Sequence, residues 1–207
     1  MSDQPSETQW TTWMDQLAEQ EYLMVDDFLP PALFAAVLQA FERRLNAEGF
    51  TAAGIGSQGD HQVNQQIRGD WVHWLDEGKD ADMAGFFQHL DTWRGMLNRY
   101  CYLGLSDFEC HFAHYPAGTF YHRHLDQFKG RNNRMISTVF YLNQEWQERD
   151  GGHLILYQAE TTRIQPKGNR MVLFQSAAVE HEVALTHKSR YSLTGWFLRQ
   201  PKGLGMY

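Results

Sequence analysis

Three residues with metal-binding side chains stand at a spacing that favours one kind of metal site. His124 and Asp126 are separated by a single residue, and His181 follows much later in the chain. In an extended strand, side chains two residues apart point to the same side. A second imidazole from His181 would complete a set of two histidines and one carboxylate, which binds one face of a non-heme Fe(II) and leaves the opposite positions open. The sequence therefore predicts an iron site at His124, Asp126 and His181, with room for O2 and a second ligand.

Arg190 adds a possible anchor for that second ligand. The patterns around His181 and Arg190 predict two antiparallel strands joined by a turn at 186–189, which would place the two residues close together across a hairpin. A guanidinium holds a carboxylate with two hydrogen bonds. 2-Oxoglutarate has the matching shape, because it chelates iron at one end and leaves a carboxylate at the other. We therefore predict that Arg190 binds the far carboxylate of 2-oxoglutarate.

Each of these residues also has an ordinary structural explanation. The chain has ten histidines, so a His-x-Asp pair is easily produced by chance, and His122 stands close enough to replace His124 as a ligand. Arg190 alone would be interpreted as a strand-edge residue in water. The remaining histidines considered have no partner at a useful spacing and are interpreted as structural: His111, His114, His153 and His187.

The pattern of apolar residues changes from helical to strand-like at residue 106. Helical periodicity predicts helices over 9–20, over 80–100, and from Pro30 to a C-cap at Gly49. An early strand is expected at 22–25. Strand-like runs then follow at 106–114, 135–142, 153–157, 171–174, 180–184 and 191–198. Helices first and many short strands after predict a helix-backed β sandwich or barrel.

Two segments are expected to be irregular. Residues 1–8 are polar and predict a disordered end. Residues 51–66 contain several glycines among polar residues and show little periodicity, which is typical of a loop. That loop is interpreted either as a surface connection or as a mobile lid over a site.

The bulk properties exclude several classes of protein. The formal net charge of the 207 residues is −7, which argues against a broad nucleic-acid-binding face. Two cysteines provide no disulfide framework and favour a reducing compartment. The first residues lack the features of a secretory signal, and no stretch is apolar enough to span a bilayer. We expect a cytoplasmic protein that binds neither nucleic acid nor membrane.

The order of several short motifs resembles the Fe(II)- and 2-oxoglutarate-dependent dioxygenases of the prolyl 4-hydroxylase family. The strongest likeness is to the oxygen-sensing HIF prolyl hydroxylases and their bacterial relatives, and it extends over about 22–198. The motifs that carry it are Ile67-Arg68-Gly69-Asp70 with Trp74, Tyr115-Pro116, His122-Arg123-His124-Leu125-Asp126, Tyr141-Leu142-Asn143 with Trp146, Gly151-Gly152, His181-Glu182-Val183, and Arg190 to Trp196.

The resemblance implies a fold and a role for each matching residue. It implies an α+β, mainly β, chain with a double-stranded β-helix (jelly-roll) core over 101–198, supported by helices and a lid loop within 1–100, as one domain over 1–207. It assigns the iron to His124, Asp126 and His181. The implied cosubstrate-binding residues are Arg190, Tyr141, Thr194 and Tyr115, and the implied substrate-side residues are Arg68, Asp70 and Trp196. The three aromatic residues could instead be ordinary core residues, and Arg68 and Asp70 a local ion pair.

The resemblance also implies a reaction. Fe(II), 2-oxoglutarate and O2 would hydroxylate a prolyl residue of a protein substrate at C4, yielding succinate and CO2, with ascorbate keeping the iron reduced. Two alternatives stay open at this point. One is a dioxygenase that acts on a free amino acid or another small molecule, and the other is a non-catalytic metal- or ligand-binding module.

Overall fold

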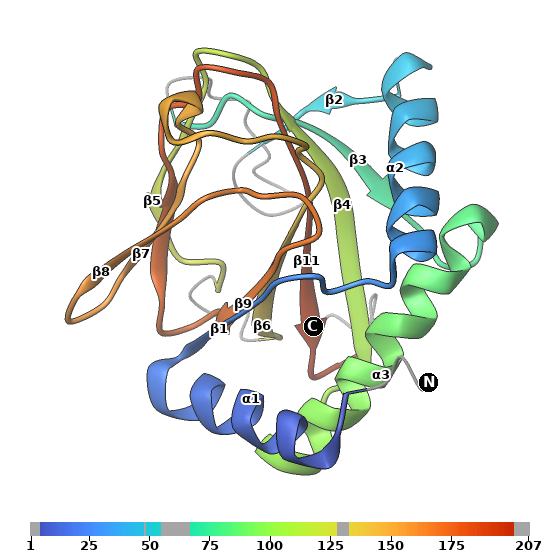
Figure 1. Cartoon of the computed structure of the whole chain (residues 1–207), viewed down its shortest axis with the longest axis vertical. Coiled ribbons are helices and arrows are strands. Elements are labelled where there is room, and N and C mark those ends of the chain that lie inside the picture. Colours follow the sequence, from blue (N-terminus) through green and yellow to red (C-terminus); the bar gives the residue numbers. More distant parts are fainter. Residues whose placement is uncertain (1–4, 48, 55–66, 128–132, 201–207) are drawn as a thin grey trace, which may run out of the picture.

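The computed structural model describes residues 5–47, 49–54, 67–127 and 133–200 (Figure 1). Three α-helices precede most of the strands, and the second half of the chain is almost entirely β. In chain order the elements are α1 (Glu7–Gln20), β1 (Tyr22–Val25), α2 (Pro31–Asn46), β2 (Thr51–Ala52), β3 (Trp71–Leu75), the 3-10 turn η1 (Ala81–Met83), α3 (Ala84–Cys101), β4 (Asp107–Tyr115), β5 (Tyr121–His124), β6 (Arg134–Tyr141), the 3-10 turn η2 (Glu148–Asp150), β7 (Leu154–Tyr157), β8 (Thr161–Ile164), β9 (Met171–Gln175), β10 (Glu180–Val183) and β11 (Arg190–Leu198).

The strands form two antiparallel sheets that face each other. The larger sheet has the order β1-β9-β6-β11-β4-β3-β2, and the smaller sheet has the order β5-β10-β7-β8. Strands consecutive in sequence thus often belong to different sheets, as β9, β10 and β11 do. This is the jelly-roll arrangement, and the prediction of a mainly β, α+β fold is confirmed.

The helices cover the outer face of the larger sheet (Figure 1). Period-two alternation sends Phe112, Phe140 and Phe197 outward into one hydrophobic core shared with helical residues such as Phe86 and Leu97. All three helices are amphipathic, so each buries one face against this sheet. None of them, within the described segments, combines the length and the apolar character needed to cross a bilayer.

The opposite face of the larger sheet points at the smaller sheet and is called the inner wall below. Tyr141 of this face packs with Leu156 of β7, and Tyr115 packs with Val183 of β10. The inner wall consists of Glu109, His111, Ala113 and Tyr115 from β4, of Arg190, Ser192, Thr194 and Trp196 from β11, and of Ser137, Val139 and Tyr141 from β6. Side chains far apart in sequence are therefore held in rows by strand register.

Most predicted elements are confirmed, with differences at the ends and the edges. The first helix begins at Glu7 with Ser6 as its N-cap, so part of the expected disordered end is helical. The second helix ends at Asn46 and is capped by Ala47, so the predicted C-cap at Gly49 is wrong. The strands β2, β3 and β8 were not predicted, and all three are short and lie at or near sheet edges. Residues 55–66 of the predicted lid lie outside the described residues.

The close approach of β11 to β4 depends on Gly195. A Cβ atom at this position would clash with Phe108 Cζ and would lie 2.7 Å from the Glu109 carbonyl oxygen. We therefore expect Gly195→Ala to destabilise the protein by about 1–3 kcal/mol, which a denaturant titration would measure. Gly95→Ala is the matched control, because nothing lies within 4 Å of its Cβ position in α3. Equal effects of the two substitutions would contradict this explanation.

Candidate metal centre and cosubstrate pocket

Two paired strands of the smaller sheet and the turn after one of them bring three metal-binding side chains together. His124 at the end of β5 is the register partner of His181 in β10. Asp126 follows two residues later, beyond the end of β5, so the turn rather than an extended strand directs its carboxylate to the same point. One ligand atom from each residue lies within 4.8 Å of the other two. The Nε2 atoms of His124 and His181 are 3.7 Å and 3.6 Å from the carboxylate oxygens of Asp126.

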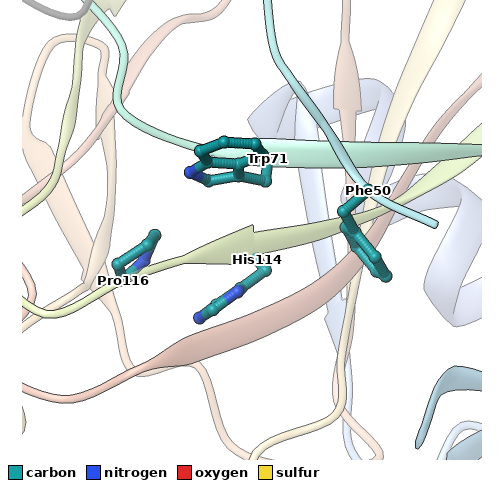
Figure 2. A pocket seen from close by; sticks show the side chains of 4 residues that line it. All are labelled: Phe50, Trp71, His114 and Pro116. Carbon is teal, nitrogen blue, oxygen red and sulfur yellow. The ribbon is translucent and has the colours of Figure 1, made fainter. Parts of the chain in front are cut away.

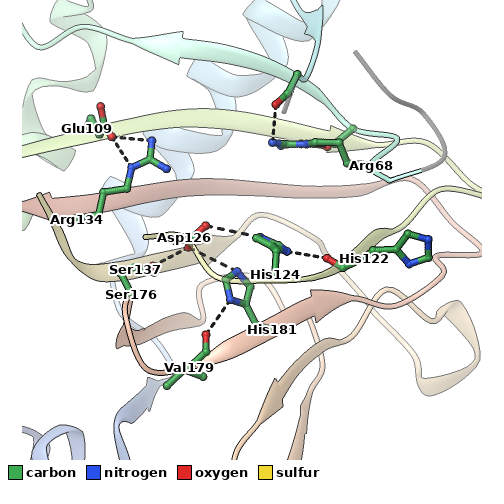
Figure 3. A network of polar contacts seen from close by, with 12 residues as sticks. Arg68, Glu109, His122, His124, Asp126, Arg134, Ser137, Ser176, Val179 and His181 are labelled. Carbon is green, nitrogen blue, oxygen red and sulfur yellow. Dashed lines mark hydrogen bonds and ion pairs between the residues drawn. The ribbon is translucent and has the colours of Figure 1, made fainter. Parts of the chain in front are cut away.

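Backbone hydrogen bonds orient the two histidine rings so that their Nε2 atoms point toward Asp126 (Figure 3). The Nδ1 atom of His124 lies 2.7 Å from the carbonyl oxygen of His122, and that of His181 lies 3.2 Å from the carbonyl oxygen of Val179. Each Nδ1–H therefore donates to the backbone, which leaves both Nε2 lone pairs directed at the shared point. Such outer contacts fix the tautomer and orientation of metal-binding histidines.

Ser137 plays the corresponding part for the carboxylate. Its hydroxyl donates to Asp126 Oδ2 at 2.7 Å and lies 2.9 Å from the hydroxyl of Ser176. Sequence reasoning missed Ser137, although it stands four residues before Tyr141 and therefore on the same face of the same strand.

The charge states of His181 and Asp126 suit a divalent cation. Burial lowers the pKa of His181 to about 4, so this imidazole is neutral at neutral pH. Burial alone would raise the pKa of Asp126, but the adjacent imidazoles of His181 and His124 and the Ser137 hydroxyl hold it well below its usual range. A neutral imidazole and an ionised carboxylate are the forms that bind a metal ion.

His122 does not share this arrangement. Its ring points away from the cluster and is exposed, while only its backbone carbonyl contacts His124 (Figure 3). Among the described residues, the cluster His124, Asp126 and His181 is the one group of three His, Cys, Asp or Glu side chains placed to hold a metal ion.

Arg190 is buried on the inner wall at the first position of β11. Only 1% of it is exposed, its Nε donates to the carbonyl of Gly152 at 2.9 Å, and its Nη1 donates to Ser192 Oγ at 3.3 Å. The ion pairs on the inner faces of the described segments involve other cations, so Arg190 has no carboxylate partner there. A buried charge without a counter-ion is costly. The site therefore fits an anionic ligand.

The predicted hairpin between His181 and Arg190 is wrong. β10 belongs to the smaller sheet and β11 to the larger one, so the two strands do not pair. The connection between them crosses from one sheet to the other, and the two residues face each other's sheets across the interior. Gly152 lies against Arg190 and accepts its Nε hydrogen bond. Glycine suits this position, because its backbone has a φ of +62° and a Cβ atom there would lie only 3.1 Å from Arg190 Cδ.

Two tyrosines flank the guanidinium of Arg190. Its Cζ lies 4.9 Å from the ring centre of Tyr115 and 5.1 Å from that of Tyr141. The hydroxyl of Tyr141 is buried and has no hydrogen-bond partner among the described residues. A buried hydroxyl without a hydrogen-bond partner, beside a buried guanidinium without a carboxylate partner, is the arrangement expected of a carboxylate-binding pocket.

Thr194 lies on the same strand face, between the Arg190 end and the metal end of the inner wall. It pairs in register with Val139 of β6, whose neighbours on that face are Ser137 and Tyr141. Ser137 contacts Asp126, and Tyr141 contacts Arg190. The inner wall therefore leads from the metal-binding cluster to the cationic anchor and passes Thr194.

Arg68 and Asp70 form a local ion pair. Their two charge-assisted hydrogen bonds measure 2.7 Å and 2.6 Å, and the side chain of Asp70 is fully buried. The guanidinium of Arg68 also lies 4.4 Å from the ring centre of Tyr121, which stacks on His124 at 3.7 Å. The pair thus supports the metal-binding cluster from one side through Tyr121, a residue that sequence reasoning missed.

Trp196 lies at the metal end of the inner wall, in register with Ser137. Arg134 covers its ring at 3.5 Å and is itself paired with Glu109 at 2.8 Å (Figure 3). Trp74 of β3 is near Trp196, with ring centres 6.1 Å apart, and is half exposed. The aromatic residues thus extend from the metal-binding cluster to the surface.

A separate hollow lies on the other face of β3 and β4 (Figure 2). It has a volume of about 400 Å³ and is lined by Phe50, Trp71, His114 and Pro116. Trp71 and His114 are register partners, and both alternate with inner-wall residues. This hollow therefore does not communicate with the metal-binding cluster through its lining residues.

The comparisons with known proteins agree with this geometry. The family model of the 2OG-Fe(II) oxygenase superfamily matches residues 110–198. The structure of a Pseudomonas putida prolyl-4-hydroxylase is 37% identical, with a TM-score of 0.84, over 92% of this chain and 99% of that one. A prolyl hydroxylase from Trichoplax adhaerens, solved with a peptide fragment of the hypoxia-inducible factor oxygen degradation domain, is 26% identical, with a TM-score of 0.81, over 92% of this chain and 89% of that one.

A second animal relative is longer than this chain. The hypoxia-inducible factor prolyl hydroxylase of Caenorhabditis elegans is 27% identical over 88% of this chain, which spans only 27% of that longer protein. The Pseudomonas protein, by contrast, matches this chain over nearly the full length of both. Together, the two sheets, the clustered side chains and these relatives show that the chain belongs to the prolyl 4-hydroxylase family of the 2OG-Fe(II) oxygenases.

Proposed function

We propose that this protein is an Fe(II)- and 2-oxoglutarate-dependent prolyl 4-hydroxylase that acts on a prolyl residue of a protein substrate. The observation that carries the proposal is the pairing, inside one jelly roll, of the His124, Asp126 and His181 cluster with the buried and carboxylate-free Arg190. Relatives described as prolyl hydroxylases, one of them in complex with a peptide, support the substrate class.

The residues present fit both absent groups. Fe(II) would be held by His124, Asp126 and His181, whose Nε2 and carboxylate atoms already converge. The far carboxylate of 2-oxoglutarate would satisfy the guanidinium of Arg190 and the unpaired hydroxyl of Tyr141. When bound with O2, the iron and 2-oxoglutarate supply an oxidant that can hydroxylate an unactivated C–H bond, with release of succinate and CO2.

The other residues orient and shield these groups. Thr194 and Tyr115 would line the cosubstrate pocket, and Trp196 would separate it from solvent at the substrate side. Arg68 and Asp70 would act by holding Tyr121 against His124. Exclusion of water matters here, because it strengthens the electrostatic contacts and prevents side reactions of the oxidant.

Further properties follow from the same proposal. Ascorbate would serve as the reductant that keeps the iron active, and residues 1–207 would act as one dioxygenase domain. The net charge of −7 argues against a nucleic-acid partner, and the two cysteines, which provide no disulfide framework, favour a reducing compartment such as the cytoplasm.

The direct test combines the protein with Fe(II), 2-oxoglutarate, ascorbate and a cell extract under air. We expect succinate release together with prolyl peptides that gain 16 Da, both measured by mass spectrometry. Asp126→Ala is the control. Succinate no greater than in that control would show that the enzyme assignment is wrong. Succinate accompanied only by modified small molecules would show that the protein-substrate assignment is wrong.

The contact between Ser137 and Asp126 makes a separate prediction. We expect Ser137→Ala to weaken Fe(II) binding about 10-fold, since loss of an outer-sphere partner typically lowers metal affinity by about 10- to 100-fold. An anaerobic titration with Fe(II) would measure it. Thr138→Val is the matched control, because its hydroxyl is also buried on β6 but has no hydrogen-bond partner among the described residues. An unchanged affinity in Ser137→Ala would contradict the assigned role.

A further inference from the structure

His111 is a buried polar residue that the proposed reaction does not yet use. It lies in the middle of β4, on the inner wall, and only 4% of it is exposed. Its register partners are Trp74 of β3 on one side and Thr194 of β11 on the other. It therefore sits in the row that contains the cosubstrate-pocket residue Thr194. The interpretation of His111 as merely structural does not explain this position.

One ring nitrogen of His111 has no hydrogen-bond partner. Its Nδ1 is fully buried and unpartnered among the described residues. A buried polar group without a partner destabilises a fold. What distinguishes this atom from an unpartnered group on the outward face, such as the Thr138 hydroxyl, is its place on the inner wall beside Thr194. A bound ligand could supply the missing partner there.

The surroundings of His111 place that ligand on the substrate side. Its ring is 4.8 Å from that of the half-exposed Trp74 and 5.5 Å from that of Trp196. The indole N–H of Trp196 is likewise buried and without a hydrogen-bond partner among the described residues. The three rings form a wall from the surface to the metal end of the interior, where a polypeptide would enter.

The imidazole is neutral in this environment. Burial, followed by the positive charge of Arg68, lowers the pKa of His111 to about 3, and Arg134 acts in the same direction. The carboxylates of Asp70 and Asp126 oppose this shift without reversing it. A neutral imidazole has one N–H donor and one acceptor nitrogen.

A prolyl residue in a substrate chain offers one backbone atom that the imidazole of His111 could bind. A prolyl residue within a chain has no N–H and offers only its carbonyl oxygen for a backbone hydrogen bond. We propose that His111 is a substrate-binding residue that donates a hydrogen bond to the backbone carbonyl of the target prolyl residue and so sets its position over the iron. This inference rests on the proposed prolyl hydroxylase function and names one contact that would hold the substrate backbone in place.

The first test needs no substrate. His111→Phe keeps an aromatic ring and removes the unpaired nitrogen. We expect the melting temperature of the metal-free and cosubstrate-free protein to rise by roughly 2–4 °C. A fall in melting temperature would overturn the inference, because it would show that His111 contributes to the stability of the fold.

The second test measures binding and coupling. The probe is the synthetic, unmodified peptide corresponding to a prolyl peptide that gains 16 Da in the cell extract. We expect His111→Phe to weaken its binding to the anaerobic Fe(II) and 2-oxoglutarate complex about 5- to 10-fold. The ratio of succinate to hydroxyproline should rise, since a poorly positioned substrate uncouples the reaction. The 2-oxoglutarate affinity, followed by the visible charge-transfer absorption, should stay within about twofold.

Two further variants make the outcome specific. His111→Asn retains a donor and should restore part of the peptide affinity, whereas His114→Phe changes the outward face of the same strand and should leave it unchanged. Unchanged binding and coupling in His111→Phe, with an active wild-type enzyme, would overturn this inference alone. A wild-type enzyme that modifies no prolyl residue would overturn the proposed function and this inference with it.

Discussion

Asp126→Ala is expected to abolish Fe(II) binding and, with it, succinate release. Asp126 is the only anionic member of the cluster, and both imidazole Nε2 atoms point at its carboxylate from less than 4 Å. Its loss should exceed the roughly 10- to 100-fold loss of affinity that follows removal of an outer-sphere contact. The measurement is an anaerobic Fe(II) titration together with succinate release in air.

His122→Ala is the matched control for this prediction. It removes the neighbouring imidazole but keeps the backbone carbonyl that accepts from His124 Nδ1. We expect its Fe(II) affinity and succinate release to stay within about twofold of the wild-type values. If His122→Ala lost the metal while Asp126→Ala retained it, the assigned ligand set would be wrong.

Arg190→Ala is expected to raise the 2-oxoglutarate concentration needed for half-maximal activity by about 100-fold or more. The substitution removes two charge-assisted hydrogen bonds, each of which contributes about 1.5–3 kcal/mol. Fe(II) binding should remain within about twofold, because Arg190 lies on the larger sheet and makes no contact with the metal-binding residues. Titrations with 2-oxoglutarate and with Fe(II) measure the two effects separately.

Two more variants define the anchor. Arg190→Lys retains the charge but loses the planar fork, so its effect should be intermediate. Tyr141→Phe should raise the 2-oxoglutarate requirement by about 10-fold without lowering the stability of the cosubstrate-free protein, because the hydroxyl has no hydrogen-bond partner among the described residues. Melting temperatures check that each variant is folded. Equal losses of iron and 2-oxoglutarate binding in Arg190→Ala would contradict this division of roles.

Local patterns were sufficient to predict most of the secondary structure. Period-two alternation predicted the strands of the core, since each strand places alternate side chains toward the helices and toward the interior between the sheets. Helical periodicity predicted the three supporting helices. Short edge strands such as β2 and β8 were missed, because two to four residues contain too little pattern to distinguish them from a loop.

Residue type and spacing also predicted the metal site and the carboxylate anchor. Two histidines and an aspartate are informative because few metals suit that ligand set, and an arginine is informative because few ligands need its fork. These properties belong to the side chains and do not depend on how the strands pair.

Only the tertiary structure decided how these residues meet. The sequence placed His181 and Arg190 in one hairpin, but they lie in opposite sheets, and Arg190 is held instead by Gly152. Strand partners depend on loop closure and on the packing of both faces, which local alternation does not encode. The contact of Ser137 with Asp126 and the isolation of His111 arise for the same reason, because register between distant strands determines which buried polar atoms find a partner.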